Sequence, residues 1–320
     1  PFYSAICSLL FLIFFCSSKK IELVSNFLPN PHDPQVINSF LGPAQEVLQK
    51  QGIQIVPTDL LHDLTSEEIL KVVVWTQPIA EEGKKPLKVK RIPKGKGILF
   101  LWEPPTIFPR TSREANLKYF SKVYTWDDSL VDNKKFFKFY YPVMFPMRED
   151  VVPFDQKGLV AFVFSNKTLE IPHEKDLYPE RERLVQFFET KPEGEFVCYG
   201  RGWENKGLKH YKGVAENKIE VIRNFRFTIA YENSRDLPGY VTEKIFDAFH
   251  AGSVPVYLGA PNIERYVPKK CFIDRREFSS NEELYKFLKE MKEERYNQYL
   301  DNIREFLKSE KAYLFSTTKF

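Results

Sequence analysis

Short runs of apolar, β-branched and aromatic residues recur along the chain and alternate with segments of helical period. Because these runs are continuous rather than alternating with polar residues, they are typical of parallel strands that are covered on both faces. The pattern therefore predicts an α/β fold with parallel sheets. Strands are expected at residues 53–57, 71–75, 97–102, 119–126, 158–165, 195–199, 226–231 and 253–258.

The segment 137–154, FKFYYPVMFPMREDVVPF, contains three prolines and has no clean period, which predicts a domain junction there. A chain of 320 residues is long enough for two domains. We expect an N-terminal α/β domain at residues 21–150 and a C-terminal α/β domain at residues 151–320. From about Asn281 onward, apolar residues recur at helical spacing with charges on the other face, which predicts C-terminal helices packed on that domain.

Residues 1–20 begin with an uncharged apolar run, PFYSAICSLLFLIFFC, that is shorter than the ~20 residues needed to span a bilayer. The chain starts with Pro rather than Met, so we expect upstream residues and interpret the run as the end of a signal peptide or signal anchor. It predicts association with a membrane and is excluded from the fold.

The composition excludes several classes of protein. Hydrophobic residues make up 43% and charged residues 28%, which is ordinary for a globular chain. The net charge of +4 is far from the basic stripe of a nucleic-acid-binding protein, so no nucleic-acid partner is expected. Outside the leader only Cys198 and Cys271 remain, which can pair but need not, and no close Cys/His cluster predicts a structural zinc site.

The stretch 225–260 predicts a βαβ unit that can hold an anion. Its first strand ends at Glu232-Asn233, Thr242 can cap a helix over residues 243–250, and Gly252 can end that helix. Lys244 falls in the first turn, where a cation opposes the helix dipole unless an anion offsets it. The alternative is a solvated Lys244 beside Glu243. Asn233 and Tyr240 offer hydrogen bonds on the same rim.

The string AYENS…GYVTEKIFDAFHAGSVPVYLGAPNIERYVP closely resembles the donor-site signature of α1,3-fucosyltransferases, glycosyltransferase family 10. The segments VAFVFSN, FVCYGRGW, FLWEPPTIFP and VYTWDDSLVDNKKFFKFYYP resemble other parts of the same family, so the likeness covers about residues 97–273. The resemblance implies the GT-B fold, with two Rossmann-like domains and a cleft between them. It also implies inverting transfer of L-fucose from GDP-fucose to the 3-hydroxyl of a GlcNAc or glucose unit in a glycan.

The matching positions imply roles for individual residues. Lys244 and an arginine after the SN motif would neutralise the GDP diphosphate, since a guanidinium binds phosphate oxygens with two parallel hydrogen bonds. Arg181 and Arg183 both fit this second role, and the resemblance favours Arg181, because its spacing to Leu184 and Phe188 better matches the family pattern. Tyr240 would hydrogen-bond the phosphates, and Asn233 and Glu243 would contact ribose, phosphate or fucose. Asn166, within the SN motif, is expected to be part of the donor site.

An inverting transfer needs a general base for the acceptor hydroxyl, which the family draws from the N-terminal domain. The resemblance assigns this role to Glu103, within Trp102-Glu103-Pro104, where similar bacterial enzymes have Gly-Glu-Asn. Asp127 and Asp128 are alternatives that follow a different strand. They lack the spacing of a DxD metal motif, so no tightly bound metal or other cofactor is predicted, while Mn²⁺ or Mg²⁺ could still stimulate turnover.

Two other functions remain open at this point. One is a GT-B glycosyltransferase that uses another nucleotide sugar, and the other is a non-catalytic, membrane-anchored protein that binds a nucleotide sugar or glycan. The predicted location is the Golgi membrane for a eukaryotic protein and the inner membrane for a bacterial one. The small number of cysteines slightly favours the bacterial setting.

Overall fold

The computed structural model describes residues 20–25, 50–51, 53–57, 69–75, 92–107, 117–169, 172–316 and 319. The predicted apolar leader lies outside these residues except for Lys20, which is the first residue of a strand. None of the helices described there combines the length and the apolar character that crossing a bilayer requires. The chain divides into two compact units, residues 1–140 with residue 320, and residues 141–319. This boundary lies within the proline-containing segment 137–154.

The N-terminal unit contains a six-stranded sheet in the order β2-β1-β3-β4-β5-β6, and every pair of neighbours is parallel. The four strands expected from apolar runs are confirmed. The other two strands were not expected. Strand β1 follows directly on the leader, and β6 is only three residues long at the sheet edge, so neither has a strong pattern of its own. The strands are β1 (Lys20–Ser25), β2 (Gln54–Pro57), β3 (Ile69–Trp75), β4 (Gly97–Leu101), β5 (Phe120–Thr125) and β6 (Phe136–Lys138).

The C-terminal unit contains a five-stranded parallel sheet in the order β11-β10-β9-β7-β8. Its four longer strands are those expected from the sequence, and the two-residue β11 was not predicted. The chain runs from β7 to β8 on one side and then returns to β9 on the other, so the direction of strand addition reverses between β7 and β9. The strands are β7 (Gly158–Val163), β8 (Phe196–Tyr199), β9 (Phe225–Tyr231), β10 (Val254–Leu258) and β11 (Ile273–Asp274).

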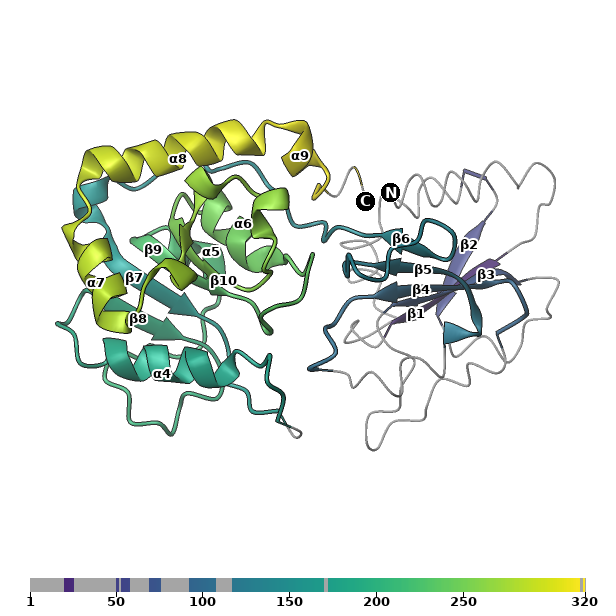
Figure 1. Ribbon diagram of the computed structural model, residues 1–320, viewed down its shortest axis with the longest axis horizontal. Coiled ribbons are helices and arrows are strands. Elements are labelled where there is room, and N and C mark those ends of the chain that lie inside the picture. Colours follow the sequence, from purple (N-terminus) through teal and green to yellow (C-terminus); the bar gives the residue numbers. More distant parts are fainter. Residues whose placement is uncertain are drawn as a thin grey trace. The chain divides into compact units, whose positions relative to one another are not determined.

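Helices cover both faces of this sheet (Figure 1). Helix α4 packs on one face, where Phe188 stacks on Phe196 of β8, and α5 and α6 pack on the other face against β7, β9 and β10. The C-terminal helices are confirmed, and α8 packs against α6 through Phe306. The helices are α4 (Tyr178–Phe188), α5 (Lys218–Ile222), α6 (Glu243–His250), α7 (Asn281–Glu290), α8 (Glu293–Leu307) and α9 (Glu310–Tyr313), with 3₁₀ turns at Phe154–Gln156, Ile263–Arg265, Lys269–Cys271 and Arg275–Glu277.

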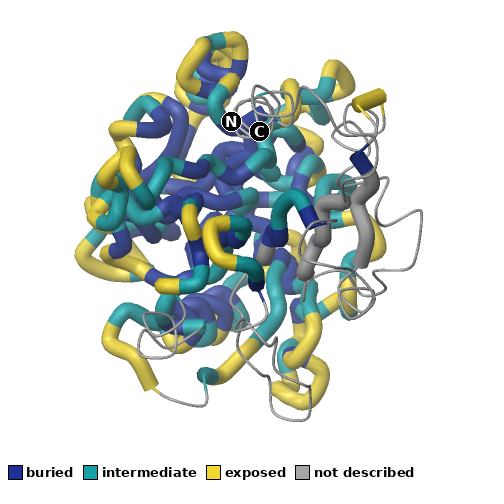
Figure 2. The backbone as a smooth tube through the Cα atoms, turned by 90° about the vertical axis from the view of Figure 1, so that its right-hand side faces the viewer, coloured by how far each residue is buried: buried dark blue, intermediate teal, exposed yellow. Residues whose placement is uncertain are grey.

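The predicted βαβ unit is confirmed as β9–α6–β10. Helix α6 has the predicted bounds, and its side chains Ile245, Ala248 and Phe249 are all 0% exposed. Gly252 follows the helix with φ +67°, a left-handed conformation that ends helices and favours glycine. Figure 2 shows the buried segments of the backbone in dark blue. Thr242 precedes the helix as predicted, but its side chain does not cap it.

The turn after β8 explains one glycine of the FVCYGRGW segment. Gly200 has φ +140°, and a Cβ atom there would come 2.1 Å from the carbonyl oxygen of Phe164 after β7. Only glycine therefore allows the ends of β7 and β8 to approach so closely. In the same region, Cys198 lies buried in β8, and it and Cys271 are free thiols rather than a disulfide.

Candidate functional site

A cavity of about 260 Å³ lies at the carboxyl ends of β7 and β9. It is lined by the residues that end β7, by the first turns of α4, α5 and α6, and by Asn233 after β9. This is the point where the strand order reverses, and open parallel sheets bind ligands in the crevice at such a point. The topology and the cavity therefore identify the same place independently.

The charges on the cavity wall favour an anion. The lining residues include one carboxylate, Glu243, and four cations, Lys167, Arg181, Lys218 and Lys244. Backbone N–H groups in the first turn of α6 add partial positive charge at the same end of the sheet. Among the cations, Lys218 also forms an ion pair of 2.8 Å with Asp247. The site is thus built to receive a group with more than one negative charge.

Arg181 lies on the buried face of α4 and is 2% exposed. Its guanidinium carbon lies 4.6 Å from the ring centre of Phe164 and 4.9 Å from that of Tyr178, so two aromatic faces hold it. Nη2 donates to the Tyr231 carbonyl at 2.6 Å and to Asn233 Oδ1 at 3.1 Å. Within the described residues, Nε is buried and has no hydrogen-bond partner. A rigid guanidinium with an unused donor lines the cavity.

Lys244 lies between two carboxylates at the start of α6. Its Nζ is 2.9 Å from Glu243 Oε1 and 3.3 Å from Glu232 Oε2, and its side chain is 13% exposed. Burial lowers the pKa of Lys244, but the two carboxylates outweigh burial and raise it above its ordinary value. Burial raises the pKa of Glu243, while Lys244 and Lys218 outweigh this effect and lower the pKa to about 2. Both groups are therefore charged at neutral pH.

Glu232 belongs to this group of charges, although sequence reasoning assigned it no role. It is 0% exposed, and it accepts hydrogen bonds from the Thr242 backbone N–H at 2.8 Å and the Thr242 hydroxyl at 2.6 Å. The signal in the sequence was the position of a carboxylate directly after a buried strand. That position could not show that the side chain turns into the protein toward the start of α6.

Three of the predicted donor-site residues, Arg183, Asn166 and Tyr240, are not part of the cavity lining. Arg183 lies two positions from Arg181 and therefore on the opposite face of α4, where it is 64% exposed and paired with Glu180 at 2.7 Å. Asn166 donates through Nδ2 to the Gly202 carbonyl at 3.3 Å, while the residues on either side of it line the cavity. Tyr240 is 1% exposed with its ring edge-on to Tyr141, and it does not line the cavity.

The predicted base lies in the N-terminal unit. Glu103 is half-buried in the loop that follows the fully buried strand β4. The two alternatives support their own loop: Asp127 accepts from the backbone N–H and hydroxyl of Ser129, and Asp128 pairs with Lys138 at 2.7 Å. The assignment of the base to Glu103 stays a prediction.

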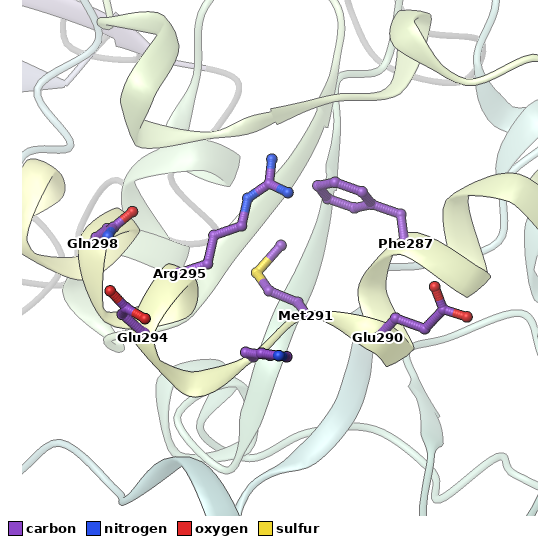
Figure 3. Close-up of a pocket in the computed structure, with 7 residues that line it drawn as sticks. Phe287, Glu290, Met291, Glu294, Arg295 and Gln298 are labelled. Carbon is purple, nitrogen blue, oxygen red and sulfur yellow. The ribbon is translucent and has the colours of Figure 1, made fainter.

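A second pocket, of about 520 Å³, lies where α7 passes into α8 (Figure 3). It is larger than the cavity at the strand ends, but its chemistry differs. Its two cations, Lys292 and Arg295, are balanced by Glu290 and Glu294, and the Arg295 guanidinium lies 4.8 Å from the ring centre of Phe287. Because it lacks excess positive charge and lies away from the strand ends, it is not the candidate site.

In the described part of the chain, no three His, Cys, Asp or Glu residues form a group that could hold a metal ion. The absence of a tightly bound metal and a stimulatory effect of Mn²⁺ or Mg²⁺ both remain predictions. The cavity lining contains Lys and Arg, side chains that bind phosphate groups without a metal ion.

Comparison with known families matches residues 155–318, just over half of the chain, to the model described as "Glycosyltransferase family 10 (fucosyltransferase) C-term". The 4-galactosyl-N-acetylglucosaminide 3-alpha-L-fucosyltransferase 9 of Mus musculus is 36% identical over 142 residues, which is 44% of this chain and 34% of that protein. An alpha-(1,4)-fucosyltransferase of Arabidopsis thaliana is 38% identical over 126 residues, 35% of this chain and 31% of that protein. The match thus spans about a third of these relatives.

Solved structures extend the likeness of fold to nearly the whole chain. An α1,3-fucosyltransferase matches with a TM-score of 0.61 at 16% identity, over 94% of this chain and 87% of that one. An Anabaena protein, HepE, solved with UDP-glucose, matches with a TM-score of 0.57 at 10% identity, over 94% of this chain and 96% of that one. The predicted α/β fold of GT-B type is confirmed. These identities are too low to carry information about the donor.

Proposed function

Because the chain belongs to glycosyltransferase family 10, the fucosyltransferase family, we propose that it transfers L-fucose from GDP-fucose to a hydroxyl of a glycan. The observation that carries the proposal is the cavity at the strand reversal, which Arg181 of α4 and Lys244 of α6 line beside the first N–H groups of α6. A nucleoside diphosphate is the part of a sugar donor that this charge distribution fits.

The proposed reaction is an inverting displacement at the fucose C1 atom. The acceptor hydroxyl gives its proton to the Glu103 carboxylate while its oxygen forms the new bond to C1. The bond from C1 to the β-phosphate oxygen breaks, and its electron pair leaves with GDP. Arg181 and Lys244 stabilise the negative charge that grows on the diphosphate, which is usually the largest catalytic contribution.

The identity of the sugar acceptor is proposed from the relatives. Enzymes named for 3-fucosylation of galactosyl-N-acetylglucosaminides share the matched segment, which favours O3 of a GlcNAc unit, with glucose as the alternative acceptor unit. The two relatives named above come from an animal and a plant, so we also propose that the protein acts at the Golgi membrane and is attached through its apolar residues 1–16. Release of the full chain from membranes by detergent, but not by high salt, would support this attachment.

A thermal-shift comparison of GDP, GDP-fucose, UDP, ADP and CMP tests the donor. A ligand at 100 times its Kd should stabilise the folded protein by about 2.7 kcal/mol, which raises Tm visibly. We expect a shift with GDP and GDP-fucose, none with the other three nucleotides, and loss of the shift in Lys244→Ala. The full chain should be measured in mild detergent because of its apolar leader.

A larger shift with UDP would contradict the fucosyl-donor assignment and favour a different nucleotide sugar. Binding of GDP-fucose without any release of GDP in the presence of N-acetyllactosamine would favour a binding protein over an enzyme. If transfer occurs, NMR of the product should show an α-fucoside, which is the product of inversion at a β-linked donor.

A further inference from the structure

Glu232 connects the end of β9 to the start of α6. It follows directly on the last residue of the strand, and Thr242 directly precedes the helix. Glu232 Oε1 accepts from the Thr242 backbone N–H, and Oε2 accepts from the Thr242 hydroxyl. Both residues are at most 2% exposed, so water does not compete for these bonds.

The direction of these hydrogen bonds extends to Lys244. A threonine hydroxyl has one proton to donate and lone pairs with which to accept. Because the Thr242 proton is directed to Glu232, the oxygen presents its lone pairs to Lys244 Nζ, 3.0 Å away. Glu232 Oε2 itself lies 3.3 Å from the same ammonium. The carboxylate and the hydroxyl thus fix the ammonium from the protein side.

Glu232 does not line the cavity, whereas Lys244 and Glu243 do. A ligand in the cavity therefore meets the ammonium without touching the buried carboxylate. Burial raises the pKa of Glu232, while Lys244 and the two Thr242 donors oppose that rise. The buried charge is held by its partners and takes no direct part in the chemistry proposed above.

We propose that Glu232 and Thr242 are positioning residues that hold the Lys244 ammonium in the place where it meets the donor diphosphate. The inference rests on the proposed function, because it assigns Lys244 to that diphosphate. It differs from a purely structural role in one respect: the effect of either residue on ligand binding must pass through Lys244.

The test is a double-mutant cycle on GDP affinity, measured by calorimetry on variants whose folding is checked by circular dichroism. Thr242→Val keeps the shape of the side chain but removes the hydroxyl, and we expect about tenfold weaker GDP binding. Thr242→Ser restores the hydroxyl and should bind within about twofold of the parent. In a Lys244→Ala background, Thr242→Val should change GDP affinity by less than about twofold.

Equal losses from Thr242→Val in both backgrounds, or a Ser variant as weak as the Val variant, would overturn the proposal. Glu232→Gln provides a second approach, because it removes the carboxylate charge that lies 3.3 Å from the Lys244 ammonium and replaces one oxygen with an amide donor. It should weaken GDP binding at least as much as Thr242→Val, and again only while Lys244 is present.

A result without ligand separates this inference from the proposed function. If the parent protein fails to bind GDP, the donor assignment fails, and the cycle is then read from urea unfolding of the ligand-free protein. Non-additive effects of Thr242→Val and Lys244→Ala on the free energy of unfolding would support the contact between the Thr242 hydroxyl and the Lys244 ammonium. Strictly additive effects would overturn it.

Discussion

Two glutamates follow buried strands of the two parallel sheets, and their surroundings differ. Glu103 follows β4 of the N-terminal unit and is half-buried in a loop that starts with Trp102 and continues into prolines. Glu232 follows β9 of the C-terminal unit, is 0% exposed, and commits both oxygens to Thr242. A carboxylate at a strand end therefore does not identify a base by its position alone.

The difference lies in which groups each carboxylate has to satisfy. A buried carboxylate is stable only if hydrogen bonds and a cation replace its lost water, so its lone pairs are no longer available to a substrate. Glu232 fulfils this requirement with Thr242 and Lys244. A general base must instead reach the proton of an incoming hydroxyl, which requires access. The contacts of Glu232 therefore fit a supporting role, and the proposed base role of Glu103 requires access to the acceptor hydroxyl.

Among these variants, Glu103→Gln should have the largest effect on transfer, and an unchanged kcat would contradict the base role of Glu103. Removal of the base is expected to lower kcat for transfer about 10²–10⁴-fold, because the amide cannot accept the acceptor proton. GDP affinity should stay unchanged, since Glu103 belongs to the other unit and not to the cavity lining. Initial rates and calorimetry measure the two quantities separately. Asp128→Asn serves as the matched control, and a comparable loss of kcat in that variant would move the base role to the loop after β5.

Two arginines on α4 allow the same comparison for cations, because Arg181 is buried and lines the cavity whereas Arg183 is exposed. Arg181→Lys and Arg183→Lys make the same chemical change on opposite faces of one helix. Lysine keeps the charge but loses the planar fork, so we expect about tenfold weaker GDP binding for Arg181→Lys. For Arg183→Lys we expect a change of less than about twofold, because the exposed pair with Glu180 contributes little. Similar losses in both variants would contradict the assignment of the diphosphate to Arg181.

Much of the C-terminal unit could be predicted because its signals are local. The helix at 243–250, its stop at Gly252 and its parallel neighbours follow from the periodicity of one continuous stretch. The phase of α4 places Arg181 at the cavity and Arg183 in solvent, and it depends on which side of the helix meets the sheet. The role of Glu232 was hidden for a similar reason: residues ten apart in the sequence meet only when the strand and helix are assembled. Short edge strands such as β6 and β11 are formed by pairing and leave little pattern in the sequence.

Lys157 is another buried cationic side chain of the C-terminal unit, and it does not line the cavity. It is 4% exposed, and its Nζ donates to the Gly252 carbonyl at 2.5 Å and to the Tyr296 hydroxyl at 3.0 Å. Burial, assisted by Arg223, lowers the pKa of Lys157 to about 7. The unfolded chain, with a lysine pKa near 10.5, then binds more protons than the folded chain above neutrality. Stability should therefore rise with pH from about 7 toward 10.5.

Between pH 7 and 8.5 this rise should amount to about 1–2 kcal/mol in the free energy of unfolding, measured with urea. Lys157→Met should remove the rise and leave GDP affinity unchanged, because Lys157 contacts α8 and the turn after α6 rather than the cavity. Lys270→Met is the matched control, since that lysine is 52% exposed and should leave the pH dependence as it is. If the slope persists in Lys157→Met, burial of this amine does not govern the stability of the unit.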